Sequence, residues 1–284
     1  MINYDITPIA GACGAEIHGM DLSRDLDEEA VDAIRAALLD HLVVFFPDQT
    51  LTPDQQIAFG QRFGELDIDR FVVPMEGHPE MMVLIKEPDE TVNFARIWHS
   101  DVTFQERPAM GSILYAVEVP PYGGDTMWAN EYLAYDALSA GMKKLLGGLR
   151  AVHSARGGYG KAVLNKRYDQ TKRSMKIYRD RDHIAEQEVT HPVVRTHPET
   201  GRKAIYVNGA YTERFEGMTA EESKPILQYL YQHSIRPEFT CRFRWTQGAV
   251  AFWDNRAAMH YPINDYHGSR REMRRITICG DQPA

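Results

Sequence analysis

Hydrophobic and polar residues alternate along the chain in two ways, which divide it into predicted helices and strands. From Asp27 to His41, apolar side chains recur every three or four residues, the spacing of an amphipathic helix. This helix leads directly into residues 42–46 (Leu-Val-Val-Phe-Phe), a short and continuous apolar run that ends at Pro47. Its length and its β-branched and aromatic residues favour a buried strand.

Two further helices are predicted from their first residues. Residues 52–55 (Thr-Pro-Asp-Gln) and 219–222 (Thr-Ala-Glu-Glu) both place a threonine three positions before a Gln or Glu. This is the pattern of a capping box, in which the two side chains bond to each other's backbone N–H groups. Gly64 is expected to end the first of these helices.

Several other segments have the period or the length of strands. Residues 239–245 and 275–279 alternate apolar and polar side chains, and 249–253 form a short apolar run. The first 25 residues are expected to form strands and turns. A few helices around many strands, without repeated β-α-β units, predict an α+β protein with a mostly β core and a helical cover.

Composition narrows the classes of protein. The 284 residues show no repeats or low-complexity tracts, so one domain spanning 1–284 is expected. The formal net charge of −8 argues against nucleic acid as a partner. A signal peptide and a membrane span of about 18 apolar residues are not expected. The three cysteines form no CxxC pair, which favours reduced thiols in a cytoplasmic protein.

The sequence Trp-His-Ser-Asp at 98–101 is the sharpest chemical feature. In an extended chain His99 and Asp101 point to the same side. Together with His260 they would provide two imidazoles and one carboxylate, the ligand set of non-haem Fe(II) sites that activate O2. Such His-x-Asp pairs are common, so a histidine hydrogen-bonded beside a surface aspartate remains an alternative from these residues alone.

A basic segment follows His260. If residues 270–275 are extended, Arg271 and Arg275 share one face. Two inward guanidinium groups need anions, because an unpaired buried charge is costly. A dicarboxylate co-substrate would supply them through bidentate pairing. Arg270 and Arg274 would point the other way, onto a solvated basic face.

With these residues in place, the chain resembles the TauD/TfdA family of Fe(II)/2-oxoglutarate-dependent dioxygenases. The resemblance covers nearly the whole chain. It rests on ordered blocks at 14–17, 44–47, 63–66, 98–104, 123–126, 191–198, 253–255 and 271–281. It implies a double-stranded β-helix (jelly roll) with helical insertions.

The resemblance also implies roles for individual residues. The residues that match the family's iron ligands are His99, Asp101 and His260. Arg271 and Thr126 match residues that bind the distal carboxylate of 2-oxoglutarate. Arg275 matches a second arginine near the iron and the co-substrate, which contacts the anionic group of the substrate in the taurine enzyme.

The activity implied is hydroxylation of a small, anionic organic substrate by O2, with decarboxylation of 2-oxoglutarate to succinate and CO2. If the hydroxylated carbon carries oxygen or sulfur, a C–O or C–S bond then breaks, as expected for aryloxyalkanoates, alkyl sulfates or sulfonates. A homodimer or homotetramer is implied. A non-catalytic protein of the same fold that senses Fe(II) or 2-oxoglutarate is the alternative.

The substrate itself is less clearly indicated. The residues expected along the substrate pocket are Asp69, Val102, Tyr159, Tyr211 and Arg275. Taurine enzymes have a sulfonate-binding histidine at the position of Asp69 and an asparagine at that of Ala95, so taurine is not favoured. Asp69 would repel a sulfonate or else face solvent. Tyr159 and Tyr211 replace phenylalanines and could stack on an aryl ring or bond to an ether oxygen.

Overall fold

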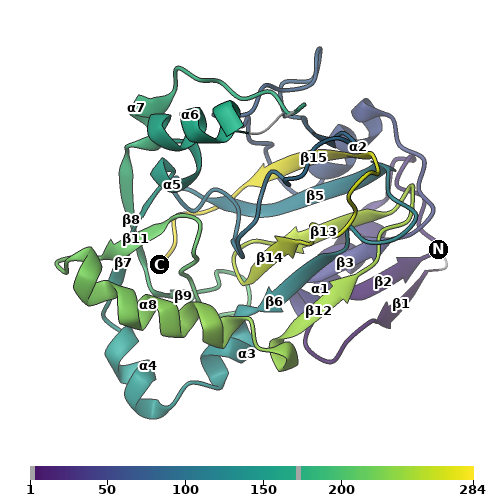
Figure 1. Ribbon diagram of the computed structural model, residues 1–284. Helices are drawn as coiled ribbons and strands as arrows, with labels where there is room; N and C mark the ends of the chain where they lie inside the picture. The colour runs from purple at the N-terminus through teal and green to yellow at the C-terminus, as the bar shows by residue number, and fades with distance from the viewer. Residues whose placement is uncertain (1–3, 171–173) are drawn as a thin grey trace.

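A seven-stranded sheet lies at the centre of the computed structural model, which describes residues 4–170 and 174–284 (Figure 1). From one edge to the other its strands are β1 (Asp5–Pro8), β2 (Ala15–His18), β3 (Val43–Phe46), β13 (Val250–Asp254), β5 (Ala109–Glu118), β15 (Arg271–Cys279) and β4 (Met82–Lys86). Neighbouring strands are antiparallel, except for the parallel pair β2 and β3. The C-terminal strand β15 therefore lies inside the sheet.

Three smaller antiparallel sheets complete the strands of the described residues. They are β12 (Thr240–Phe243), β6 (Thr126–Asn130) and β14 (Ala258–Pro262); β11 (Thr212–Phe215), β7 (Arg150–Ser154) and β8 (Glu188–Pro192); and β10 (Lys203–Ile205) with β9 (Val194–Thr196). The predicted strands at 42–46, 239–245, 249–253 and 275–279 are confirmed, with slightly different ends. The α+β prediction with mostly strands is confirmed.

The helices occupy the connections between strands. They are α1 (Glu28–His41), α2 (Pro53–Gln61), α3 (Glu131–Asp136), α4 (Ala140–Leu146), α5 (Arg156–Tyr159), α6 (Lys161–Gln170), α7 (Asp182–Ala185) and α8 (Ala220–Ser234), with a 3-10 turn at Pro237–Phe239. The capping boxes at Thr52 and Thr219 are both formed. Helix α2 ends before Gly64, because the Arg62 N–H bonds to the Phe59 carbonyl three residues back and tightens the last turn.

In the middle of the central sheet both faces are buried. On one face, Phe252 and Ile276 pack against α1 and α2. On the other, Trp253 packs against Trp128 of the β12-β6-β14 sheet, and their rings are 5.9 Å apart. Because neither face of β3 and β13 meets water, these strands are continuous apolar runs and not alternating ones.

The same double burial corrects one expectation about β15. Arg274 does not lie on a solvated face: it is 7% exposed, and its guanidinium lies 4.7 Å from the centre of the Tyr115 ring and donates to the Leu51 carbonyl. Helix α2 packs on this part of the sheet. The alternation of residues within β15 does not predict that a helix covers this face. Arg270 does stay near the surface, where it pairs with Glu87, Glu118 and Glu272.

None of the helices in the described part of the chain combines the length and the apolar character that crossing a bilayer requires.

Glu131, the first residue of α3, gives a prediction about stability and pH. It is 1% exposed, its Oε2 accepts a hydrogen bond from Ser234 Oγ at 2.8 Å, and its Oε1 has no partner among the described residues. Burial raises the pKa of Glu131 to about 8 from 4.5. The folded protein therefore holds a proton that the unfolded chain releases, and the free energy of unfolding should fall as the pH rises through this range.

Glu131→Gln is expected to stabilise the protein at pH 8 and to remove this pH dependence, which amounts to about 3 kcal/mol between pH 5.5 and pH 8. Urea unfolding at pH 5.5 and pH 8 measures both effects. Glu76→Gln, at an exposed position, is the matched control and should leave the difference between the two pH values unchanged. Identical pH dependence in wild type and Glu131→Gln would contradict the prediction.

Candidate active site

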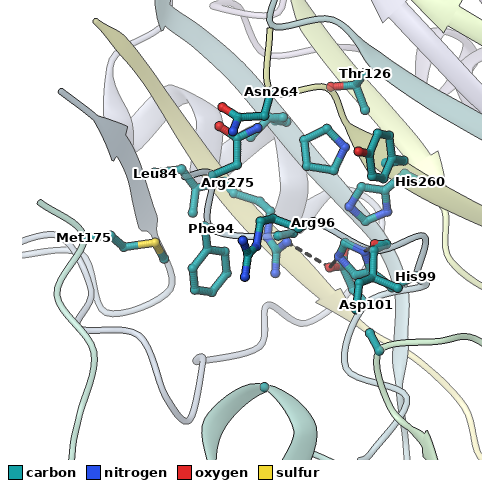
Figure 2. A pocket seen from close by; sticks show the side chains of 18 of the residues that line it. Leu84, Phe94, Arg96, His99, Asp101, Thr126, Met175, His260, Asn264 and Arg275 are labelled. Carbon is teal, nitrogen blue, oxygen red and sulfur yellow. Dashed lines mark hydrogen bonds and ion pairs between the residues drawn. The ribbon is translucent and has the colours of Figure 1, made fainter. Parts of the chain in front are cut away.

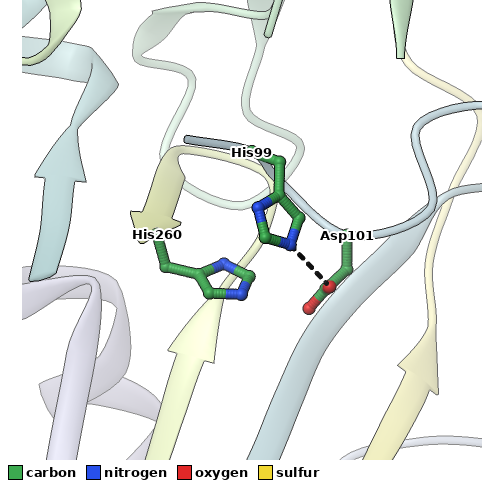
Figure 3. Close-up of side chains that lie close together, drawn as sticks. All are labelled: His99, Asp101 and His260. Atoms are coloured by element: carbon green, nitrogen blue, oxygen red, sulfur yellow. Dashed lines mark ion pairs between the residues drawn. The ribbon is translucent and has the colours of Figure 1, made fainter. Parts of the chain in front are cut away.

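Backbone hydrogen bonds bring the three predicted metal ligands together. The His99 N–H donates to the His260 carbonyl at 3.1 Å, and the His260 N–H donates back at 2.7 Å, so the segment before β5 is joined to β14. The two imidazole rings lie 4.2 Å apart, and Asp101 follows on the same side as His99 (Figure 3). One ligand atom from each of the three residues lies within 4.8 Å of the others.

The surroundings of the two histidines suit metal binding. His99 Nδ1 donates to the Ile97 carbonyl at 2.7 Å, which leaves Nε2 with its lone pair, 3.8 Å from Asp101 Oδ1. A ring nitrogen fixed by a backbone carbonyl in this way is typical of metal-binding histidines. Burial lowers the pKa of His99, and it lowers the pKa of His260 to about 3. Both imidazoles are therefore neutral, as a metal ligand must be.

Asp101 is held as a carboxylate at a fixed angle. Burial alone would raise the pKa of Asp101, but the Arg275 guanidinium and the hydrogen bond from Ser112 hold it well below its usual value. Arg275 Nη1 donates to its Oδ1 at 2.8 Å, and Ser112 Oγ donates to its Oδ2 at 2.8 Å. Asn255 accepts from the Asp101 N–H and from Trp253 Nε1, both at 3.0 Å.

Ser112 and Asn255 were not predicted as site residues. Asn255 lies in the block at 253–255 that carried the family resemblance, so a signal for it existed. Ser112 has no signal in the sequence, because its role depends on where β5 lies next to Asp101. Both residues hold the Asp101 carboxylate in one orientation by hydrogen bonds, as is typical of residues that support a metal ligand.

A cavity of about 560 Å³ opens beside the three ligands (Figure 2). The predicted site residues, which all line it, are His99, Asp101, His260, Thr126, Arg271, Arg275, Asp69, Val102, Tyr159 and Tyr211. Figure 2 shows His99, Asp101 and His260 on one side of the cavity and Leu84, Phe94 and Met175 on the other. The volume of the cavity is within the usual range for small-molecule binding sites.

Near Arg271 and Thr126 the cavity wall is positively charged, and Arg271 forms no ion pair within the described residues. Arg271 is 8% exposed and makes no hydrogen bond among the described residues; the Trp245 and Tyr266 rings are each centred 5.9 Å from its guanidinium. The hydroxyl of Thr126 accepts from Trp245 Nε1 at 2.9 Å, so its own proton is free to be donated. An anion is therefore expected between these two side chains.

The predicted substrate residues surround the space in front of the triad. Asp69 lies on the cavity wall, with its Oδ1 fixed by the N–H groups of Phe71 and Val72, and burial raises its pKa. Tyr159, from α5, stacks on Phe71 with ring centres 4.2 Å apart. Tyr211 presents its ring to His99, with centres 6.2 Å apart. These side chains limit the access of water to the triad.

Comparison with known proteins agrees with this geometry. Residues 5–277 match the model of the taurine catabolism dioxygenase TauD, TfdA family. The chain is 39% identical to an alpha-ketoglutarate-dependent sulfate ester dioxygenase of Pseudomonas putida, over 99% of this chain and 91% of the relative. It is 36% identical to an alkylsulfatase of Acinetobacter baylyi, over 96% and 84% of the two chains.

A solved structure shows the same fold. It is the crystal structure of a putative alpha-ketoglutarate-dependent taurine dioxygenase from Burkholderia xenovorans, which is 38% identical and aligns over 99% of this chain and 94% of its own, with a TM-score of 0.82. The expectation of a 2-oxoglutarate-dependent dioxygenase is thereby confirmed over the sensor alternative. The family match, the sequence identity to these relatives and the shared fold show that the chain belongs to the TauD, TfdA family of dioxygenases.

Proposed function

We propose that the cavity is the active site of an Fe(II)-dependent enzyme that couples oxidation of 2-oxoglutarate to hydroxylation of an organic substrate. Succinate and CO2 are the products from 2-oxoglutarate. The observation that carries this proposal is the meeting, in one cavity, of the His99, Asp101 and His260 ligands with the unpaired Arg271. The three candidate ligands or the buried arginine alone would be compatible with other functions. A metal site next to a buried cation suits a dicarboxylate, which can chelate the metal at one end and pair with the cation at the other.

In this proposal His99, Asp101 and His260 hold Fe(II). The ion, once bound, supplies coordination positions for 2-oxoglutarate and O2 and the electrons that activate O2. The protein's residues provide position and shielding. Ser112 and Asn255 keep Asp101 aimed at the ion, and Tyr159 and Tyr211 restrict water.

Arg271 and Thr126 bind the distal carboxylate of 2-oxoglutarate in this scheme. The guanidinium offers bidentate pairing and the Thr126 hydroxyl offers its free proton. Arg275 bonds to Asp101 and neutralises this carboxylate next to the metal site. It also lines the cavity in which the co-substrate and the substrate are proposed to bind.

We assign the substrate to small organic anions with an apolar body, of the aryloxyalkanoate, alkyl sulfate or sulfonate type. Leu84, Phe94 and Met175 provide apolar walls. Asp69 lies close enough to Arg275 to offset its positive charge, so the anionic group of any of these substrates is disfavoured at that point of the cavity. Arg96 is exposed at the cavity and makes no ion pair among the described residues, so it is available for the anionic group. Hydroxylation at a carbon next to oxygen or sulfur would then release the remainder.

The same proposal extends to the whole molecule. The β12-β6-β14 sheet packed on the central sheet supports a double-stranded β-helix, and relatives that align over the full length support a single domain across 1–284. We also propose a homodimer or homotetramer. A cytoplasmic location is proposed because Cys13, Cys241 and Cys279 are free thiols.

Arg271→Ala tests the co-substrate site. Under anaerobic conditions, Fe(II) followed by 2-oxoglutarate is expected to give a visible charge-transfer band in the wild type. In Arg271→Ala, half-maximal band intensity should require roughly 10- to 100-fold more 2-oxoglutarate, because a charged hydrogen-bond partner is lost. Fe(II) affinity should not change. Arg236→Ala, at an exposed arginine, is the control. If Arg271→Ala titrated like the wild type, the anion would have to bind elsewhere.

A further inference from the structure

Lys86 is a buried cation next to Arg271 that no step of the proposed reaction uses. It is the last residue of β4, and it lies directly opposite Arg271 in the pairing of β4 with β15. Residues directly opposite each other on antiparallel strands point to the same face of a sheet. Two like charges placed in this way are unfavourable unless an anion joins them. Both residues line the cavity.

The ammonium group of Lys86 has no hydrogen-bond partner among the described residues. Lys86 is 4% exposed, and its Nζ lies 3.9 Å from the centre of the Tyr266 ring. The Tyr266 hydroxyl donates to Asn93 at 2.8 Å, which fixes the ring. The aromatic face stabilises the charge but leaves the ammonium's hydrogen atoms free.

Glu90 is the competing partner. It is buried close enough to favour the charged form of Lys86, whereas burial and Arg271 lower the pKa of Lys86. Within the described residues the two side chains form no ion pair, and Glu90 Oε1 has no hydrogen-bond partner. If Lys86 and Glu90 served only to stabilise the fold, the Lys86 ammonium group and the Glu90 carboxylate would be expected to form an ion pair.

The charges at this end of the cavity do not balance. Lys86 and Arg271 carry two positive charges and Glu90 one negative charge. The nearby Asp125 is already bonded to Arg242 at 2.6 Å, so it does not correct the difference. One positive charge is left over in a buried place, and a single carboxylate would neutralise it.

We infer that Lys86 is a second cation for the distal carboxylate of 2-oxoglutarate, acting from β4 while Arg271 acts from β15. This inference rests on the proposed function. It assigns to the co-substrate site a residue that sequence motifs do not indicate, since Lys86 lies outside every block that carried the family resemblance. Lys86 would bind the carboxylate through its free ammonium hydrogens.

The test measures binding without turnover. The Mn(II)-loaded protein is titrated by calorimetry with 2-oxoglutarate and with 2-oxopentanoate, which has a methyl group in place of the distal carboxylate. Lys86→Met is expected to weaken 2-oxoglutarate binding roughly 10- to 100-fold and to leave 2-oxopentanoate binding unchanged. Lys86→Arg should retain most of the affinity. Lys144→Met, at an exposed lysine of α4, is the matched control and should match the wild type for both ligands.

The variant Glu90→Gln tests the role of Lys86 independently, through the direction in which 2-oxoglutarate affinity changes. If Lys86 binds the carboxylate, removing its competitor should tighten 2-oxoglutarate binding severalfold. A structural Lys86–Glu90 pair predicts weaker binding or none of this gain. If Lys86→Met changed the binding of both ligands equally, or of neither, the proposed role of Lys86 would be wrong. Tight binding of 2-oxoglutarate by the wild type would still support the proposed function. If wild type failed to bind 2-oxoglutarate, both proposals would fall.

Discussion

Replacing His99 with alanine is expected to abolish Fe(II) binding and turnover while the protein remains folded. His99 is one of the three proposed metal ligands, and its Nδ1 donates to the Ile97 carbonyl, which fixes the ring. Mutation of residues that merely support a metal ligand costs 10- to 100-fold in affinity, so loss of the ligand itself should cost more than about 100-fold. The backbone bonds to His260 do not involve the side chain and remain.

The measurement is the anaerobic titration with Fe(II), together with circular dichroism to verify the fold. His267→Ala provides the control, because this histidine is exposed. The melting temperature of His99→Ala without metal should lie close to that of the metal-free wild type, since only about one hydrogen bond, worth about 1 kcal/mol, is lost. Fe(II) affinity equal to that of the wild type would show that the ligand assignment is wrong.

Among the substitutions discussed, Asp254→Ala is expected to lower the free energy of unfolding the most. Asp254 is fully buried at the end of β13, and both of its oxygens accept from Arg256, at 2.9 and 2.7 Å. It also accepts from His197 at 3.0 Å, and Arg256 reaches Glu199 at 2.6 Å. Burial alone would raise the pKa of Asp254, yet Arg256 and His197 hold it well below its usual value.

Without this carboxylate, Arg256 and His197 would be left buried with too few acceptors. Removing one partner of a buried ion pair costs about 3–5 kcal/mol. Urea unfolding should therefore show a loss of this size in Asp254→Ala. Asp32→Ala, at an exposed position of α1, should stay within about 0.5 kcal/mol of the wild type. A small loss in Asp254→Ala would mean that Glu199 alone can satisfy Arg256.

Local chemistry accounts for what the sequence could predict. The capping boxes at Thr52 and Thr219 depend on residues three positions apart, and both formed as expected. The pairing of His99 with Asp101 likewise depends on adjacent residues. Residue types and spacing suggested His260, Arg271 and Arg275 as candidates. The resemblance was needed to give them roles, because their positions depend on strands far apart in the chain.

Tertiary contacts account for what could not be predicted. Alternation within β15 predicts that Arg274 faces solvent, because it does not reveal that α2 covers the second face of the strand. Ser112 approaches Asp101 only because β5 lies beside that segment. Lys86 faces Arg271 only through the register of β4 on β15. Each of these residues acquires its role from a partner that is distant in sequence.

The reciprocal backbone bonds between His99 and His260 have a consequence for how new specificities can arise. They hold two of the proposed metal ligands by main-chain contacts, which substitutions other than proline leave in place. Tyr159, by contrast, comes from α5, and Phe94 and Arg96 come from the segment that precedes the triad. Evolution or an engineer can therefore exchange these wall-forming side chains while the oxidising centre is inherited intact, so that one reaction serves many substrates.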